Sequence, residues 1–147
     1  MLTRFGKRAS DVLDILRAAP LVWIASEVTT GQTLTDVLRR LTSRRRLPRQ
    51  IAAVRARCAT IRACRALRPF WTLDASCVVR SLVVGTLLSD HPNVYLHIGF
   101  HAGPRSEGSD RGHAWITLDG VNVSDPDITD PKDHYIEAKR LPIRRSI

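Results

Sequence analysis

The residues of this sequence that could carry out chemistry together are a cysteine, a histidine and an aspartate in its second half. Cys77 lies in the first turn of a predicted helix, which Asp74 or Ser76 can cap. A thiol at this position feels the positive end of the helix dipole and the unpaired backbone N–H groups of the first turn. Both favour the thiolate, the nucleophilic form of cysteine, and one of these N–H groups could also stabilise an oxyanion. Cys77 is therefore the candidate nucleophile.

The other two cysteines, Cys58 and Cys64, lie in the middle of another predicted helix and are interpreted as small buried apolar residues. Three is an odd number, and the spacings C-x5-C and C-x12-C match neither a zinc motif nor a disulfide framework. The cysteine content therefore predicts a reducing, cytoplasmic location. No metal site and no glycine-rich phosphate loop is evident in the sequence, so we predict no cofactor.

His113 is the candidate base, because it begins a predicted strand directly after a Gly-rich loop and its ring can therefore reach a cleft. The remaining histidines lie in predicted turns or on polar faces of strands and are interpreted as solvated: His91, His97, His101 and His134. A third group must fix the tautomer of the base, and Asp119 and Asp125 are the candidates. Asp119 lies further along the same strand, roughly 20 Å away at the rise of a strand. Asp125, on the returning strand, can lie beside His113, so we predict Asp125 as the acid.

The turn at Asp119-Gly120 decides whether Asp125 reaches His113. A two-residue turn pairs His113 with Pro126 and turns Asp125 to the opposite face of the sheet, although it stacks the apolar residues of the two strands well. A three-residue turn with Gly120 in the left-handed conformation pairs His113 with Asp125 directly. Because catalysis requires this second register, or a bulge with the same effect, we predict the three-residue turn.

Helices fill the first part of the chain. The spacing of apolar residues predicts them at residues 10–19, continuing to 28 beyond a break or kink at Pro20, at 34–42, and from 51 to just before Pro69. Residues 76–88 are apolar on nearly every helical face, which is typical of a helix buried at the centre of a protein. Cys77 is thus positioned by the helix that the rest of the fold surrounds.

Strands fill the second part of the chain. From residue 94 the apolar period is two, which predicts strands at 94–100, 113–118, 121–124 and 133–141, with a polar, mobile loop at 101–112. Helices, then a buried helix, then an antiparallel meander indicate an α+β fold in which the buried helix packs on a small antiparallel sheet.

Charge is distributed unevenly along the chain. The formal net charge is +9, but residues 1–70 hold 15 Lys and Arg against 4 Asp and Glu, while residues 71–147 hold 8 against 10. We therefore divide the compact chain into a basic helical N-terminal region, 1–70, and a catalytic core, 71–147. The imbalance indicates an acidic partner: nucleic acid, an anionic membrane surface, or an acidic peptide or protein. The sequence contains neither a membrane-spanning segment nor a recognisable export signal.

The chain also contains the segments Cys77-Val-Val-Arg80-Ser81-Leu, a strand ending in Ile98-Gly99, and His113-Ala-Trp115-Ile-Thr-Leu-Asp119-Gly120. Together they resemble the lasso peptide biosynthesis B protein family, whose signature is a Cys followed by Arg-Ser or Arg-Ala and a His-Ala-Trp strand that leads to an Asp-Gly turn. The resemblance covers roughly residues 71–126. It implies a transglutaminase-like, papain-related core with Cys77 as nucleophile, His113 as base and Asp125 as acid.

The resemblance further implies a cysteine protease that removes the leader from a ribosomally synthesised precursor peptide, before a separate ATP-dependent cyclase closes the lasso ring. Family members either carry a fused winged-helix recognition domain or rely on a small partner protein that binds the leader. Residues 1–70 are predicted as helices without the strands that such a domain needs, so the chain resembles the stand-alone form. The basic region is then where the partner protein or the leader docks, and we expect no nucleic-acid partner and no membrane span.

Two further residues could contact the substrate. Trp115 lies on the same strand face as His113 and could line a substrate channel, although a position in the core is the simpler interpretation. Arg80, one turn after Cys77, could bind substrate, although a structural ion pair is the simpler interpretation.

Three other functions stay open. A nucleic-acid-binding module would explain the basic stretch from Arg39 to Arg68, but aromatic residues only flank that stretch. A transglutaminase or other acyltransferase on the same fold shares the chemistry up to the thioester and differs only in the acceptor. The third is a non-catalytic scaffold in a biosynthetic complex.

Overall fold

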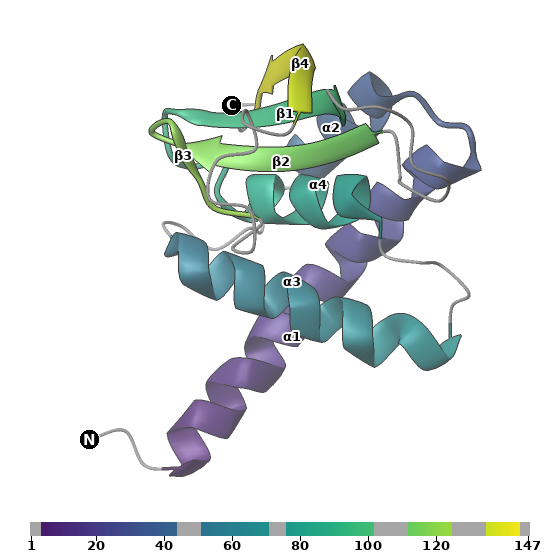
Figure 1. The fold of residues 1–147 in the computed structure, drawn as a ribbon. Coiled ribbons are helices and arrows are strands. Elements are labelled where there is room, and N and C mark those ends of the chain that lie inside the picture. Colours follow the sequence, from purple (N-terminus) through teal and green to yellow (C-terminus); the bar gives the residue numbers. More distant parts are fainter. Residues whose placement is uncertain (1–3, 44–50, 71–75, 102–111, 125–134, 145–147) are drawn as a thin grey trace.

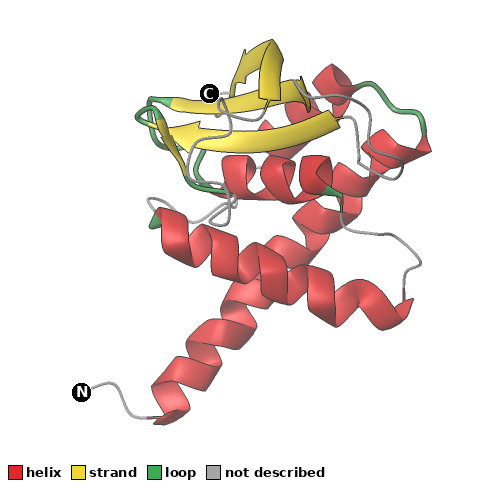
Figure 2. Ribbon diagram, in the orientation of Figure 1, coloured by secondary structure: helices red, strands yellow, loops and turns green. Residues whose placement is uncertain are grey.

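The computed structural model describes residues 4–43, 51–70, 76–101, 112–124 and 135–144. In this part of the chain α-helices lie on one side of an antiparallel sheet, which confirms the predicted α+β fold (Figure 1 and Figure 2). The helices are α1 (Arg4–Ser26), α2 (Leu34–Thr42), α3 (Ala53–Leu67) and α4 (Cys77–Leu87). The strands are β1 (Val94–His101), β2 (Gly112–Leu118), β3 (Val121–Asn122) and β4 (Tyr135–Pro142).

Helices form where the sequence predicts them, but α1 begins at Arg4, six residues before the predicted start, and ends at Ser26. α2 has the predicted bounds, and the Thr33 hydroxyl caps it by accepting a hydrogen bond from the N–H of Asp36 at 3.2 Å. α1 continues through Pro20, which lies inside the helix and does not end it. α3 ends at Leu67, ahead of Pro69, as predicted. None of the described helices is long and apolar enough to cross a membrane.

Helix α4 is the centre of the fold, as its apolar faces predict. All residues from Ser81 to Leu87 are buried, with the sheet on one side of the helix and α1 and α3 on the other (Figure 1). Gly85 allows the close approach of the sheet, because a Cβ there would lie 2.3 Å from Cδ1 of Ile143 and 2.9 Å from Cδ1 of Ile116. The helix that begins at Cys77 is therefore packed directly against β2.

The strand order of the sheet is β3-β2-β1-β4, with antiparallel neighbours. The predicted meander is wrong in its last step, because β4 pairs with β1 at the opposite edge instead of extending the sheet beyond β3. A register shift between Ile98 and Gly99 interrupts the β1–β4 pairing. Within the described residues β3 pairs only with the end of β2, so the half of β2 that carries His113 lies at the edge of the sheet.

The turn after β2 has two residues, so the predicted three-residue turn is wrong. The cross-strand pairs are Leu118 with Val121 and Thr117 with Asn122. Asp119 and Gly120 have φ angles of 51° and 83°, as in a type I′ turn, whose twist matches that of the strands it joins. The side-chain N–H of Asn93 donates to Oδ1 of Asp119 at 2.8 Å, and the N–H of Asp119 donates to the Asn93 carbonyl at 3.1 Å. These contacts, from a residue distant in sequence, favour the shorter turn.

Candidate active site

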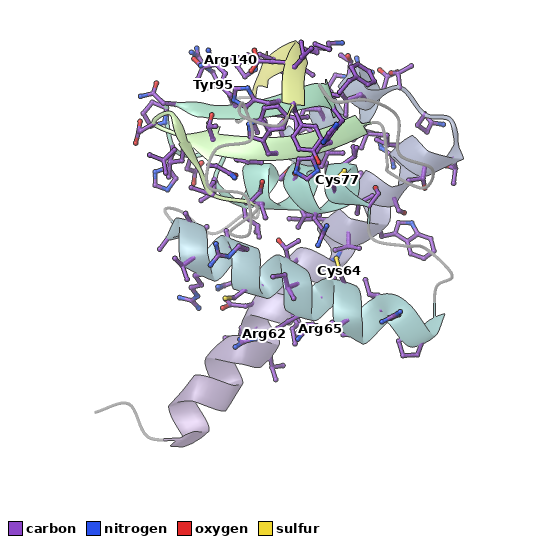
Figure 3. The ribbon with its side chains drawn as sticks, in the orientation of Figure 1. Arg62, Cys64, Arg65, Cys77, Tyr95 and Arg140 are labelled. Carbon is purple, nitrogen blue, oxygen red and sulfur yellow. The ribbon has the colours of Figure 1, made fainter. Side chains whose placement is uncertain are left out.

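Cys77 begins α4 because Ser76 caps the helix. The Ser76 hydroxyl accepts a hydrogen bond from the N–H of Val79 at 3.4 Å, and its carbonyl accepts from the N–H of Arg80 at 3.1 Å. The other predicted capping residue, Asp74, lies outside the described residues. The half-buried thiol of Cys77 therefore lies at the positive end of the helix dipole, as predicted (Figure 3).

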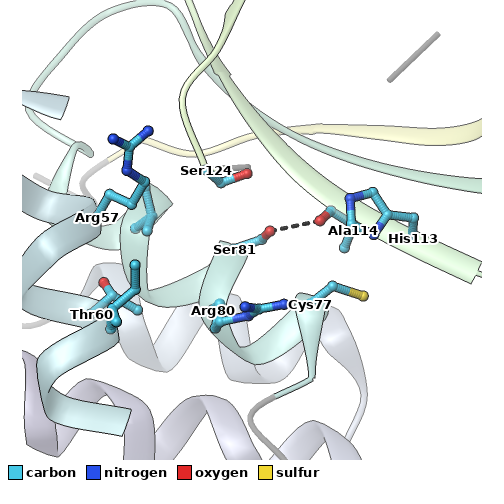
Figure 4. Close-up of a pocket in the computed structure, with 10 residues that line it drawn as sticks. Arg57, Thr60, Cys77, Arg80, Ser81, His113, Ala114 and Ser124 are labelled. Carbon is cyan, nitrogen blue, oxygen red and sulfur yellow. Dashed lines mark hydrogen bonds between the residues drawn. The ribbon is translucent and has the colours of Figure 1, made fainter. Parts of the chain in front are cut away.

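Cys77 of α4 and His113 of β2 line the same pocket, where the imidazole acts on the thiol (Figure 4). Burial on its own raises the pKa of the Cys77 thiol. Four contacts oppose burial: the hydrogen bond with the His113 side chain, the N–H of Ala114, the charge of His113, and the N–H of Val78. Together they bring the pKa below its usual value of 9.0. The thiol is therefore prepared to ionise beside an imidazole, which is the arrangement of a nucleophile and its base.

A buried serine fixes β2 against the start of α4. Ser81 lies one turn after Cys77 on the same helix and donates its hydroxyl hydrogen to the carbonyl of Ala114 at 2.8 Å (Figure 4). Ala114 thus contacts α4 through both its N–H, at Cys77, and its carbonyl, at Ser81. Because Ala114 adjoins His113, these two bonds set the distance between nucleophile and base. Ser81 was not predicted as a site residue, although a hydroxyl on an otherwise apolar helix is a signal of such a contact.

Aromatic rings hold the ring of His113. It stacks on Tyr135 of β4, with centroids 4.8 Å apart and planes 23° from parallel, and lies 6.1 Å from the ring of Trp115 at 15°. Nε2 of His113 is buried. Trp115 is itself fully buried, so it supports the base and does not line the pocket. Tyr135 was missed as a site residue because the sequence does not show that β4 lies beside β1.

His97 is buried, so its interpretation as a solvated histidine is wrong. Its ring stacks on Trp115 with centroids 5.3 Å apart and planes 8° from parallel. Nδ1 is hydrogen-bonded to the carboxylate of Glu137, and Nε2 to the hydroxyl of Thr117 at 2.8 Å. The alternation along the strand does place His97 on the same sheet face as His113, but it could not show that an indole covers it.

Asp125, the predicted acid, lies outside the described residues, and the segment that leads to it is described up to Ser124. Val123 still follows the two-residue register, since its N–H donates to the carbonyl of Ile116 at 2.9 Å. The N–H of Ile116, however, donates to the hydroxyl of Ser124 at 2.8 Å, so a side chain takes the place of a backbone acceptor. Regular backbone pairing therefore ends at Val123.

A pocket of about 110 Å³ opens beside Cys77 (Figure 4). Its lining comes from α3, α4, β2 and the segment after β3, and includes Arg57, Thr60, Cys77, Arg80, His113 and Ser124. Arg80, one of the two predicted substrate-contacting residues, thus lies at the site. The structural ion pair considered for Arg80 is not formed with any carboxylate of the described residues. Arg57 was missed, because nothing in the sequence separates it from the other arginines of α3.

The cysteines of α3 differ from Cys77 in their setting. Burial raises the pKa of Cys64, and the charge of Arg80 and a backbone hydrogen bond offset that effect only in part. Cys64 therefore stays protonated at neutral pH, as expected of a small apolar residue. In the described parts of the chain, no group of three or more His, Cys, Asp or Glu side chains could hold a metal ion.

Comparison with known proteins agrees with this geometry. A family model described as the transglutaminase-like superfamily matches residues 18–137, which is most of the chain and includes both Cys77 and His113. No curated protein and no solved structure matches the chain. The superfamily includes cysteine peptidases and transglutaminases and is typically enzymatic. The chain belongs to the transglutaminase-like superfamily.

Proposed function

We propose that this protein is a cysteine peptidase that removes the leader from a ribosomally synthesised lasso precursor peptide. Cys77 is the nucleophile, His113 the base and Asp125 the acid that orients the base. The observation that carries the proposal is that Cys77 and His113 line one pocket, where the imidazole helps to lower the pKa of the thiol. The superfamily, which includes cysteine peptidases, supports it, as does the resemblance of the Cys77 and His113 segments to the lasso B proteins.

In the first step, His113 takes the thiol proton and the sulfur of Cys77 attacks the carbonyl carbon of the leader–core amide. The carbonyl oxygen becomes an oxyanion, for which the N–H of Val78, at the start of α4, is a candidate donor. His113 then gives its proton to the amide nitrogen, the C–N bond breaks, and the core peptide leaves with a free amino group. The leader remains attached to Cys77 as a thioester.

In the second step, His113 takes a proton from water, and the oxygen attacks the thioester carbonyl. The C–S bond breaks, the leader leaves with a free carboxylate, and the thiolate–imidazolium pair is restored. Asp125 stabilises the imidazolium in both steps and fixes which ring nitrogen faces the sulfur.

The proposal is tested by incubating the protein with the precursor peptide encoded beside it, with and without the neighbouring small proteins, and weighing the products by mass spectrometry. We expect two fragments whose masses sum to that of the precursor plus one water. Cys77→Ala and His113→Ala should produce none. Cleavage that survives Cys77→Ala would contradict the peptidase assignment and favour a non-catalytic scaffold.

Acyl transfer is the second candidate function, because the superfamily also includes transglutaminases. The reaction is the same up to the thioester, and an amine then replaces water as acceptor. Adding a primary amine to the incubation distinguishes the two. A conjugate that exceeds the hydrolysed product would favour the acyltransferase.

The proposal extends to partners and location. The basic region 1–70 would dock the leader or a small leader-recognition protein, with the ATP-dependent cyclase acting next, in the cytoplasm. The leader should bind more tightly in the presence of that small protein, as measured by fluorescence anisotropy. Salt-sensitive DNA binding that survives Cys77→Ala would instead favour a nucleic-acid-binding module.

A further inference from the structure

The pocket beside Cys77 is lined by positive charge. Arg57 comes from α3 and Arg80 from α4, so the two guanidinium groups belong to different walls of one pocket (Figure 4). Arg80 lines this pocket together with Thr60 and Ile61 of α3. Among the described residues that line the pocket there is no carboxylate. The pocket that contains the candidate nucleophile is therefore lined by two cations and, within the described part of the chain, by no acid.

Neither Arg57 nor Arg80 belongs to an ion pair among the described residues. The arginines in those pairs are Arg17 and Arg55 with Asp14, Arg39 with Asp36, and Arg40 with Glu27. Two like charges that line a small pocket repel each other, and an anion bound between them relieves the repulsion. The electrostatics of the pocket therefore favour an anionic ligand.

Hydroxyl groups in the lining add to this preference. The Ser124 oxygen accepts the N–H of Ile116, so its own hydrogen is directed elsewhere and can be donated to a ligand. Thr60 differs, because its hydroxyl hydrogen is donated to the carbonyl of Ala56 at 2.9 Å. Ser124 is therefore the hydroxyl that can bind an anion together with Arg57 and Arg80.

We propose that this pocket binds the side-chain carboxylate of an aspartate or glutamate of the substrate peptide, close to the scissile bond. The proposal rests on the peptidase function proposed above and adds a substrate class to it. Guanidinium groups bind carboxylates through paired N–H donors. Because a residue of extended peptide spans at most about 3.6 Å, a pocket of about 110 Å³ that also contains Cys77 holds a side chain within a few residues of the attacked carbonyl. A pocket of this size suits a side chain better than a nucleic-acid backbone.

The first test does not depend on peptidase activity. Iodoacetate carries a carboxylate and iodoacetamide is its neutral analogue, and both alkylate thiolates. The rate of alkylation of Cys77 by iodoacetate, divided by its rate with iodoacetamide, is measured in protein that carries Cys58→Ala and Cys64→Ala. In the Arg57→Gln/Arg80→Gln double variant we expect this ratio to fall about tenfold, as for the loss of a charge-assisted hydrogen bond. An unchanged ratio overturns the proposal.

Arg65→Gln is the control for net charge, because, like Arg57→Gln, it removes one positive charge from α3. Arg65 is exposed, and it lies on the lower side of α3 in Figure 3, away from α4. We expect the control to keep the wild-type ratio. An equal fall in Arg65→Gln would assign the effect to net charge and would also overturn the proposal. If the double variant does not fold, Arg80→Gln alone serves, since Arg80 is exposed.

The second test uses the peptidase reaction. Peptides that span the scissile bond of the precursor carry Glu or Gln at each of the three positions on either side. We expect kcat/KM to be roughly tenfold to a hundredfold higher for Glu than for Gln at one position. The double variant should lose this preference, so that it cleaves the Glu and Gln peptides at similar rates.

The outcomes of the two tests separate the proposal from the function on which it rests. Equal rates for Glu and Gln at every position overturn the substrate preference. No cleavage of any peptide, with the alkylation ratio still falling in the double variant, contradicts the peptidase but supports the anion site. Protection of Cys77 from alkylation by an oligonucleotide, but not by a glutamate peptide, assigns the pocket to nucleic acid and overturns the proposal.

Discussion

At Cys77, burial and polar contacts act on the thiol in opposite directions. Burial disfavours the charged form, whereas the imidazole of His113 and the N–H groups of Ala114 and Val78 favour it. His113 therefore opposes burial in two ways, through its side-chain interaction with the thiol and through its charge. A cysteine in the same half-buried position without the histidine would be a poor nucleophile.

We expect alkylation of Cys77 by iodoacetamide to persist at lower pH than alkylation of an ordinary thiol. The rate follows the thiolate fraction, which falls as the pH drops through the lowered pKa of Cys77. In His113→Ala, burial is opposed by fewer contacts, so the midpoint of the profile should move to higher pH. Rates against pH are measured in protein that carries Cys58→Ala and Cys64→Ala. An unchanged midpoint in His113→Ala would show that the imidazole does not control the thiol.

Asp125→Asn tests the third member of the proposed triad. We expect kcat/KM to fall by roughly a hundredfold or more, with the thermal unfolding midpoint close to that of the wild type, because an amide cannot stabilise the imidazolium. Asp119→Asn is the control, since Asp119 is the other acid near His113 in sequence and belongs to the turn. Full activity of Asp125→Asn, with a loss in Asp119→Asn, would reverse the assignment.

At the scale of the elements, β1 packs against β2 at Gly99. The ring of Trp115 occupies the space that a side chain at residue 99 would need. A Cβ at Gly99 would lie 2.7 Å from the carbonyl oxygen of Ile136 and 3.1 Å from the ring of Trp115. The carbonyl belongs to the backbone of β4 and cannot move alone, and the ring stacks near His113. The place where the three strands meet thus also sets the position of the base.

We expect Gly99→Ala to destabilise the protein by about 1–3 kcal/mol and to lower the activity, because the strand backbone and the indole must both shift. Thermal unfolding gives the first effect and peptide cleavage the second. Gly112→Ala is the matched control on β2, since the one atom of the described residues within 4 Å of a Cβ there is the Gly99 carbonyl oxygen, at 3.9 Å. Equal effects of the two substitutions would mean that a methyl group at residue 99 is accommodated as easily as one at residue 112.

Local patterns predicted the elements better than the way in which they pack. The alternation and the Asp119-Gly120 signal located the hairpin, but we chose its register from what catalysis needs. The turn chemistry of Asp-Gly and the contact with Asn93 favoured the shorter turn instead. A register inferred from function carries less weight than one inferred from the turn residues themselves.

The buried faces of the helices differ from the apolar stripes that the sequence predicts. Large apolar residues marked the stripes of α1 and α3, yet Leu16 and Val54 are each 63% exposed. The buried positions of α3 are instead small: Ala56, Ala59, Thr60 and Ala63. Small residues let α3 approach its neighbours closely, which spacing alone does not reveal. For the same reason Cys77 and His113 could be found from local position, whereas Arg57 and Tyr135 depend on tertiary contacts.

On the scale of the whole molecule, a buried carboxylate holds together the two helices that lie beneath α4. Asp14 of α1 is only 4% exposed. It accepts hydrogen bonds from Nε of Arg55 on α3 at 2.8 Å and from Nη2 at 2.9 Å. This pair of bonds fixes α3 on α1, and α3 contributes Arg57 and Thr60 to the pocket wall. A contact remote from Cys77 therefore shapes the candidate active site.

We expect Asp14→Asn to destabilise the protein by about 1–3 kcal/mol, because a neutral amide cannot replace both charge-assisted bonds to the guanidinium of Arg55. Asp36→Asn is the matched control, since it breaks the exposed pair with Arg39, which is worth at most about 1 kcal/mol. Thermal unfolding should therefore separate the two variants by several degrees. Because the pocket wall moves with α3, Asp14→Asn should also reduce the iodoacetate preference at Cys77, whereas Asp36→Asn should not. Equal unfolding midpoints for the two variants would show that Asp14 does not fix α3, and the position of Arg57 would then depend on apolar packing alone.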